Sequence, residues 1–218
     1  MKMDRIGIKG PADNDFVMLD NVFGLYPVWR TLSAAPERTN FVKIPGMQGA
    51  LDCSEEFGEV FYDMRTLNMN CVYVGKNWHE DFSRFSSRYH AQAVQIVFSN
   101  DPAWYWNGRL SVSSFDAKSH KLTMKATVFP FKFRREETIV TSAGNETITL
   151  RNGRMAVVPT VTIGGPVTLA WGNYTKSLSA TSYPATVVVA GLQLTEGSLD
   201  VTITGAYSVT FRYREGAL

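Results

Sequence analysis

Cysteine and histidine are scarce in this chain of 218 residues, which has two of the former and three of the latter. Small secreted domains held together by disulfides carry more cysteines, so a disulfide framework is excluded. Cys71 lies in an apolar strand pattern and Cys53 in a loop-like segment. We therefore interpret both as reduced thiols, although their spacing leaves a single disulfide open. His79 and His90 are too far apart for the i, i+4 pair that binds zinc on a helix, so we expect no metal site and no cofactor.

Long hydrophobic runs and an excess of one charge are also missing. No segment approaches the roughly 20 apolar residues that cross a bilayer. Residues 1–7 show neither the apolar core nor the cleavage site of a secretory signal, so we expect synthesis in the cytoplasm. The 22 basic and 20 acidic residues give a net charge of +2. This balance provides no electrostatic reason to expect a membrane or a specific nucleic acid as partner.

Catalytic motifs are absent as well. The chain contains no Gly-x-Ser-x-Gly elbow and no glycine-rich phosphate loop. Acidic residues gather at Asp52, Glu55, Glu56, Glu59 and Asp63, and glycosidases use carboxylate pairs. These acids lie in a turn-rich stretch that favours a solvated loop. We predict that the protein is not an enzyme; a β-sandwich glycosidase or peptidase using these acids is the enzymatic alternative.

Strand patterns and one helix fill the first part of the chain. Short strands with loops are expected up to residue 40, then strands over 41–44, 66–74, 93–99, 106–113 and 122–133. Trp78, Phe82, Phe85 and Tyr89 fall on one stripe of a helical period, which predicts a helix packed on a sheet. Asn77, three residues before Glu80, has the spacing of a capping box.

An aromatic-rich turn is predicted over residues 99–109. Trp104 and Trp106 would share one face of a strand, with Tyr105 on the other. Exposed, the two tryptophans could stack on a sugar; buried, they would form part of the core. Because the aromatic helix needs a surface to pack on, we favour burial.

From about residue 136 the composition shifts towards Thr, Val, Ser and Gly, with no helical period. Short strands are predicted at 138–140, 147–150, 157–163, 167–171, 186–189, 199–203 and 207–213. Glycine-containing turns separate them, a spacing typical of a β-sandwich or jelly roll. The charged run at 134–137 marks the boundary, giving predicted domains of 1–135 and 136–218.

Several motifs occur in an order that resembles a known family. They are Ile44-Pro45-Gly46, Gly49-x-Leu51-Asp52, Tyr62-x-x-Arg65-Thr66-Leu67, the helix at 78–89, Asp101-Pro102-x-x-Tyr105-x-x-Gly108-Arg109 and Phe129-Pro130-Phe131-Lys132. Over residues 40–135 the chain resembles the distal tail proteins of siphophages, the long-tailed bacteriophages with non-contractile tails.

The resemblance implies a mainly β fold. Its N-terminal β-sandwich with one α-helix would be a tail-tube-like ring domain, followed by a C-terminal galectin-like β-sandwich. Six copies would form a ring at the phage tail tip, the baseplate hub of the virion. This ring would join the tail tube protein to the tail-associated fibre or lysin protein, with the tape-measure protein as a further partner and a channel for DNA.

Two sets of candidate residues follow. The segment 45–65 is apolar in places yet broken by glycines, so we hypothesise an arm that reaches the neighbouring subunit. Its interface candidates are Met47, Leu51, Phe57, Val60, Phe61, Tyr62 and Arg65. The alternative function is a glycan-binding β-sandwich involved in host adsorption, in which Trp104, Trp106, Trp171 and Tyr174 stack on sugars. The C-terminal part is too short to hold an inserted carbohydrate-binding module.

Overall fold

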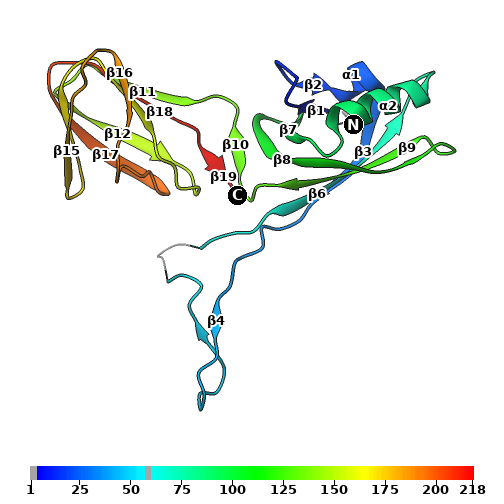
Figure 1. Cartoon of the computed structure of the whole chain (residues 1–218), viewed down its shortest axis with the longest axis horizontal. Helices are drawn as coiled ribbons and strands as arrows, with labels where there is room; N and C mark the ends of the chain where they lie inside the picture. Colours follow the sequence, from blue (N-terminus) through cyan, green and yellow to red (C-terminus); the bar gives the residue numbers. More distant parts are fainter. Residues whose placement is uncertain (1–3, 57–59) are drawn as a thin grey trace. The chain divides into compact units, whose positions relative to one another are not determined.

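The computed structural model describes residues 4–56 and 60–218 and divides the chain into two compact units, residues 1–132 and 133–218 (Figure 1). The domain boundary that the sequence predicts, after residue 135, stays a prediction. Strands dominate both units, which confirms the mainly β fold class.

In its described residues, 4–56 and 60–132, unit 1 contains two helices and one large antiparallel sheet. Its elements are β1 (Ile6–Lys9), β2 (Val17–Met18), α1 (Leu19–Phe23), β3 (Leu25–Leu32), β4 (Phe41–Val42), β5 (Leu51–Asp52), β6 (Arg65–Tyr73), α2 (Trp78–Tyr89), β7 (Ala93–Phe98), β8 (Asp101–Asp116) and β9 (Lys121–Val128). The strands of the large sheet follow the order β2-β1-β7-β8-β9-β6-β3, and β4 pairs with β5 separately. The strands of the predicted N-terminal sandwich thus form one continuous hydrogen-bonded sheet, and the two helices cover one of its faces.

Alternating side chains build the core of unit 1. In β9 the residues from Leu122 to Val128 alternate between buried and exposed or half-exposed positions, and β6 follows the same rule from Leu67 to Tyr73. The buried members face α2, and each fully buried large apolar side chain contributes about 2 kcal/mol. Cys71 is one of them, and burial raises the pKa of its thiol to about 12. Cys53 and Cys71 are both free thiols, as interpreted from the sequence.

Helix α2 confirms the predicted aromatic stripe but not its cap. Phe85 and Tyr89 are fully buried against the sheet, while Trp78 and Phe82 pack half-buried at its edge. Asn77 makes no side-chain capping bond. Its backbone N–H donates instead to the Tyr73 hydroxyl (3.1 Å), so a strand residue takes part in fixing the helix start.

Two further expectations for unit 1 were wrong. The five-residue helix α1 was not predicted, because one turn and a half is too short to show a helical period. The aromatic segment is not a turn: the turn is confined to Ser99 and Asn100, and the chain then continues as the 16-residue strand β8. An irregularity in the β7–β8 register beside Val97 allows the tight reversal.

Unit 2 is a β-sandwich. After β10 (Lys132–Arg134), which crosses the division, it comprises β11 (Thr138–Ser142), β12 (Glu146–Asn152), β13 (Thr160–Ile163), β14 (Val167–Trp171), β15 (Tyr174–Leu178), β16 (Ala185–Val188), β17 (Gly197–Thr204), β18 (Val209–Tyr213) and β19 (Gly216–Ala217). Two four-stranded sheets, β11-β18-β13-β16 and β12-β17-β14-β15, share one core. Strand β15 was not predicted, because its mostly exposed residues show no apolar alternation.

Candidate assembly surfaces

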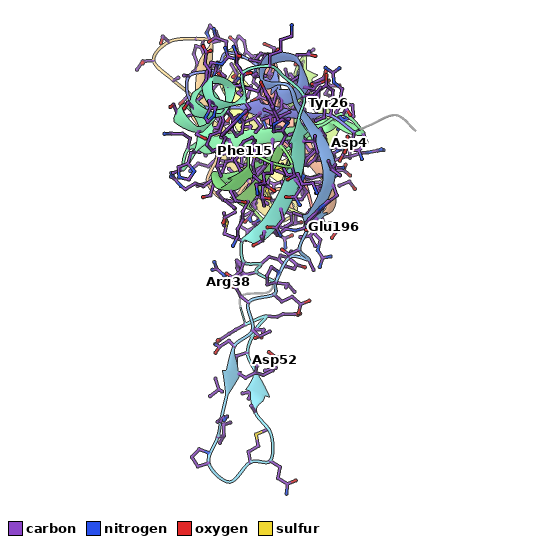
Figure 2. All side chains as sticks on the ribbon, turned by 90° about the vertical axis from the view of Figure 1, so that its right-hand side faces the viewer. Asp4, Tyr26, Arg38, Asp52, Phe115 and Glu196 are labelled. Carbon is purple, nitrogen blue, oxygen red and sulfur yellow. The ribbon has the colours of Figure 1, made fainter. Side chains whose placement is uncertain are left out.

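The described part of the connection between β3 and β6, residues 33–56 and 60–64, forms a long two-stranded arm (Figure 1). Near the sheet, Glu37 and Tyr62 form an isolated antiparallel β-bridge through their backbones. The backbone N–H of Arg38 donates to the carbonyl of Phe61 (2.8 Å). Further out, β4 pairs with β5. The arm leaves the sheet where β3 and β6 end, and Figure 2 shows Arg38 and Asp52 at successive positions along it.

Large hydrophobic side chains line this arm without being buried. Seven of them are between 41 % and 57 % exposed: Phe41, Val42, Ile44, Met47, Leu51, Phe61 and Met64. None belongs to the core of unit 1. Soluble monomers rarely concentrate exposed apolar side chains in this way, and such concentrations mark interaction sites. The arm therefore presents an apolar surface suited to contact with another protein surface.

The predicted interface candidates fall into three groups. Met47, Leu51 and Phe61 are exposed on the arm, and Val60 is half-buried. Phe57 lies outside the described residues. Tyr62 and Arg65 are half-buried at the base of the arm. The participation of all these residues in an interface stays a prediction.

The base of the arm is fastened to unit 1 through those last two residues. The ring of Tyr62 packs edge-on against Phe131, with 5.9 Å between centroids. The Arg65 guanidinium donates to the backbone carbonyls of Ser33 (2.8 Å) and Pro130 (3.3 Å). It also lies 5.0 Å from the centroid of the Trp106 ring. These contacts direct where the arm leaves the sheet.

Sequence reasoning missed Phe41, Val42, Ile44 and Met64 as interface candidates. The segment 41–44 was interpreted as a brief strand, which is confirmed for β4, but a strand assignment does not tell whether its faces are covered. The available signal was the neighbouring Pro45-Gly46, which indicates a hairpin tip where packing partners are few.

Acidic residues outnumber basic ones on the arm. Residues 33–64 carry six Asp and Glu against two Lys and Arg. Arg38 pairs with Asp63 (2.5 Å). The side chain and backbone of Ser54 donate hydrogen bonds to Asp52 and lower the pKa of its carboxyl. Glu55 and Glu56 are exposed beside it. Four of the carboxylates predicted to form a solvated loop, Asp52, Glu55, Glu56 and Asp63, therefore lie on the arm, and Glu59 lies outside the described residues.

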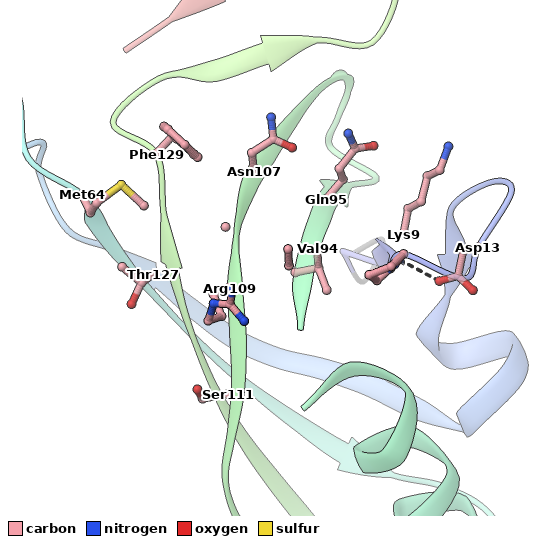
Figure 3. A pocket seen from close by; sticks show the side chains of 14 residues that line it. Lys9, Asp13, Met64, Val94, Gln95, Asn107, Arg109, Ser111, Thr127 and Phe129 are labelled. Atoms are coloured by element: carbon pink, nitrogen blue, oxygen red, sulfur yellow. Dashed lines mark hydrogen bonds between the residues drawn. The ribbon is translucent and has the colours of Figure 1, made fainter. Parts of the chain in front are cut away.

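A second surface is a groove of about 920 Å³ across unit 1 (Figure 3). It is lined by Lys9, Gly10, Pro11, Asp13, Met64, Ala93, Val94, Gln95, Asn107, Gly108, Arg109, Ser111, Thr127 and Phe129. Most of these belong to β7, β8 and β9 on the sheet face opposite the helix-covered core. Met64 and Phe129 form an apolar end, and Arg109 lies between them and Lys9 (Figure 3).

The groove presents cations and amides to its contents. Asp13 is the one carboxylate among the lining residues, and it accepts hydrogen bonds from the Gly10 N–H (2.8 Å) and the Tyr89 hydroxyl (3.0 Å). It also forms an ion pair with Arg88. Burial raises the pKa of Asp13, but these three donors together outweigh burial and hold the pKa below its usual value. Asp13 thus serves to fix the loop that closes one end of the groove.

The remaining chemistry-bearing residues do not converge. Within residues 4–56 and 60–218, no three His, Cys, Asp or Glu side chains are placed to hold a metal ion. The Nδ1 atom of His90 accepts the backbone N–H of Val112 (3.0 Å), which ties the end of α2 to β8. Over the same described residues, neither helix has the length and apolar character needed to cross a membrane.

The four glycan-stacking candidates do not form one platform. Trp106 is buried in the core of unit 1, and Trp104 is only half-buried, with the Lys132 ammonium 5.1 Å from its ring centroid. Trp171 is buried in unit 2 and donates to the carbonyl of Gly191 (3.3 Å). Tyr174, 64 % exposed, stacks on it with 5.9 Å between centroids. Only Tyr174 of the four offers an open ring face.

The fold of this chain is similar to that of a solved structure, although its sequence matches no known family. No protein-family model and no curated protein matches the sequence. Among solved structures, the chain is similar to the Dit (gp 19.1) protein of phage SPP1, described as a paradigm of the hub adsorption apparatus in phages that infect Gram-positive bacteria. The TM-score is 0.68 at 13 % identity, covering 98 % of this chain and 99 % of that one. A chain of the activated baseplate of phage p2 matches with a TM-score of 0.45 at 8 % identity over 96 % and 98 %. The similarity to the SPP1 protein shows that the chain shares its fold over 98 % of its length.

Proposed function

We propose that this protein is a structural component of a phage tail tip, in which six copies form a closed ring. The ring is the hub that joins the tail tube protein to the tail-associated fibre or lysin protein, contacts the tape-measure protein and leaves a channel for DNA. Unit 1 builds the ring, and unit 2, as a galectin-like sandwich, lies outside it. The full-length similarity in fold to a hub protein carries this proposal.

The exposed surfaces of unit 1 support assembly. Strands β2 and β3 are the two ends of the strand order of the large sheet, so among the residues that the structure describes each leaves an edge open. Near one edge, β3 exposes Tyr26, Val28 and Trp29. Open edges with apolar side chains invite association, and a closed ring with rotational symmetry covers them without producing an endless fibre. The exposed apolar arm adds a contact that extends beyond the sheet.

The oligomeric mass of the purified full-length protein tests the proposal. Light scattering coupled to size-exclusion chromatography is expected to give six times the 24.3 kDa of one chain. A variant in which Phe41, Val42 and Leu51 are all replaced by serine is expected to elute as a folded monomer, because these side chains are already exposed and contribute little to the core. A matched triple variant in unit 2, with serine at Ile139, Val158 and Val188, exposed to a similar degree, should keep the ring. A wild-type monomer at every concentration from micromolar to hundreds of micromolar would contradict the proposal.

A second function, glycan binding by unit 2, is favoured by one observation, the open ring face of Tyr174 stacked on Trp171. Aromatic faces of this kind bind sugar rings. Titration with cell-wall polysaccharide of the host should then show saturable binding that Tyr174→Ala abolishes. The control is Tyr207→Ala, another exposed tyrosine of the same unit. Binding that survives Tyr174→Ala, or is absent from the start, argues against this second function.

A further inference from the structure

The large sheet and the arm of unit 1 carry charges of opposite sign. Strands β1, β6, β7 and β9 contain no Asp or Glu, and β8 contains them only at its two ends, Asp101 and Asp116. The same strands contribute Lys9, Arg109 and Lys125. The arm, by contrast, has three times as many acidic as basic residues. The sheet and the arm of one copy therefore differ in the sign of their charge.

The strand register places these cations on one face. Lys9 is opposite Gln95, Arg109 is opposite both Ala93 and Thr127, and Lys125 is opposite Ser111. Their neighbours along each strand are buried in the core: Ile8, Leu110, Met124 and Ala126. Because side chains alternate across a strand, the cations point to the opposite face, into or beside the groove. Figure 3 shows Lys9 and Arg109 on either side of Gln95.

We propose that this groove receives the arm of a second copy of the chain. The carboxylates of Asp52, Glu55 and Glu56 then lie against Arg109 and Lys9, and the exposed apolar side chains of the arm lie against Met64 and Phe129. The inference rests on the proposed ring and adds to it the two surfaces that meet. Matching an acidic apolar arm to a basic groove with an apolar end fixes both the partner and its orientation.

The arm of the same copy leaves the groove open. Hydrogen bonds of its outer part join its own two sides, such as the Cys53 N–H to the Asn40 carbonyl (2.8 Å) and the Asn40 N–H to the Ser54 hydroxyl (2.8 Å). Met64, at the base of the arm, lines one end of the groove, so the arm begins there and extends from the ends of β3 and β6 (Figure 1). The groove crosses four adjacent strands, β1, β7, β8 and β9, whose outer axes are about 14 Å apart. That width accommodates a two-stranded hairpin.

Charge reversal at both surfaces tests the pairing. In Arg109→Glu, and separately in the double variant Glu55→Arg/Glu56→Arg, the ring is expected to dissociate at protein concentrations at least tenfold higher than the wild type. Combining the three substitutions is expected to restore assembly to within about threefold of the wild type. Lys118→Glu in the β8–β9 turn and Glu196→Arg in unit 2, both exposed, are the matched controls and should assemble normally. Mass photometry over a dilution series measures all of these.

A cross-link provides a test that does not depend on Arg109, whose guanidinium also donates to the Ala91 carbonyl. Thr127→Cys puts a thiol in the groove, where Cys53 from the arm of a second copy would meet it. Mild oxidation should then give covalent dimers and higher species, which disappear when Cys53→Ser is added. Ser87→Cys, on the exposed side of α2, should give none.

The outcomes separate this inference from the proposed ring. A wild-type ring whose assembly is unaffected by Arg109→Glu, or is weakened by it without rescue by the arm reversals, shows that the arm binds elsewhere and overturns the inference while the hub proposal stands. A ring in which Thr127→Cys forms no cross-link to Cys53 likewise shows that the arm binds elsewhere. The groove would then bind a small anion or another tail protein. A protein that forms no ring under any condition contradicts the proposed function itself.

Discussion

Replacing Asp13 by alanine should destabilise unit 1, because Asp13 holds a loop together through three partners. The side chain of Asp13 is 1 % exposed and accepts hydrogen bonds from Gly10 and Tyr89 while pairing with Arg88. Its removal leaves a buried N–H and a buried hydroxyl without their acceptor, at about 1–3 kcal/mol each. Arg88 is partly exposed and can turn to water, so its share is small. The expected loss in the free energy of unfolding is about 3 kcal/mol.

Urea denaturation followed by tryptophan fluorescence measures this loss, at one fixed protein concentration because assembly also stabilises the folded chain. Asn14→Ala is the control, since Asn14 is an exposed neighbour in the same loop, and a change within about 0.5 kcal/mol is expected. Asp13→Asn should fall between the two, because its amide oxygen can still accept from Gly10 or Tyr89. A loss below about 1 kcal/mol for Asp13→Ala would refute the reasoning.

The same residue gives a pH dependence. The folded protein holds the pKa of Asp13 below the value of about 3.9 expected in the unfolded chain. A carboxyl with a lowered folded pKa stabilises the protein above its unfolded pKa and loses that contribution as the pH falls through the folded pKa. Wild-type stability should therefore decline below about pH 4 more steeply than that of Asp13→Ala. Parallel curves for the two proteins would show that Asp13 is not ionised in the folded state.

Three further predictions concern packing, thiol reactivity and backbone geometry. Phe85→Ala should lower the free energy of unfolding by about 3–5 kcal/mol in the same assay, because Phe85 is fully buried between α2 and the sheet; a cost near that of a surface substitution would show that α2 is not docked. Cys71 should resist iodoacetamide at pH 8 in the native protein, since it is buried and its pKa is raised to about 12, while half-buried Cys53 reacts; mass spectrometry of the labelled peptides checks this, and equal labelling would disprove it. Gly24→Ala should cost at least 1 kcal/mol, because Gly24 has a φ of +61° and an added Cβ would lie 2.7 Å from the Val74 carbonyl oxygen; an unchanged melting temperature would contradict this geometry.

The elements that sequence reasoning predicted well are those with a clear apolar period. Helix α2 and strands β6 and β9 each bury one stripe or one face, so apolar residues recur along them with a helical or a strand period. Helix α1 and strand β15 show no such period, because the first is too short and the second is mostly exposed. The polar and aromatic composition of 99–109 suggested a turn, yet cross-strand pairing with β7 and β9 makes most of it strand. Tertiary pairing overrode local composition there.

The candidate surfaces were predictable only in part. The glycine-broken apolar stretch after Pro45 indicated an arm, and residues 33–56 and 60–64 form one in the structure. Whether Phe41 or Met64 is exposed depends on which residues pack over it in the folded chain. The sequence pattern does not contain this information. The groove depends on residues from β1, β7, β8 and β9 that meet only after folding. Arg109 and Lys9 are distant in the sequence, and no local spacing relates them.

Negative-stain electron microscopy of the purified full-length protein tests the central claim most directly, namely that copies of this chain complete one another. Class averages should show hollow rings with sixfold symmetry that are absent when the exposed apolar residues of β4 and β5 are replaced by serine. Single compact particles from the wild-type protein, or rings that persist unchanged in the arm variant, would contradict the account.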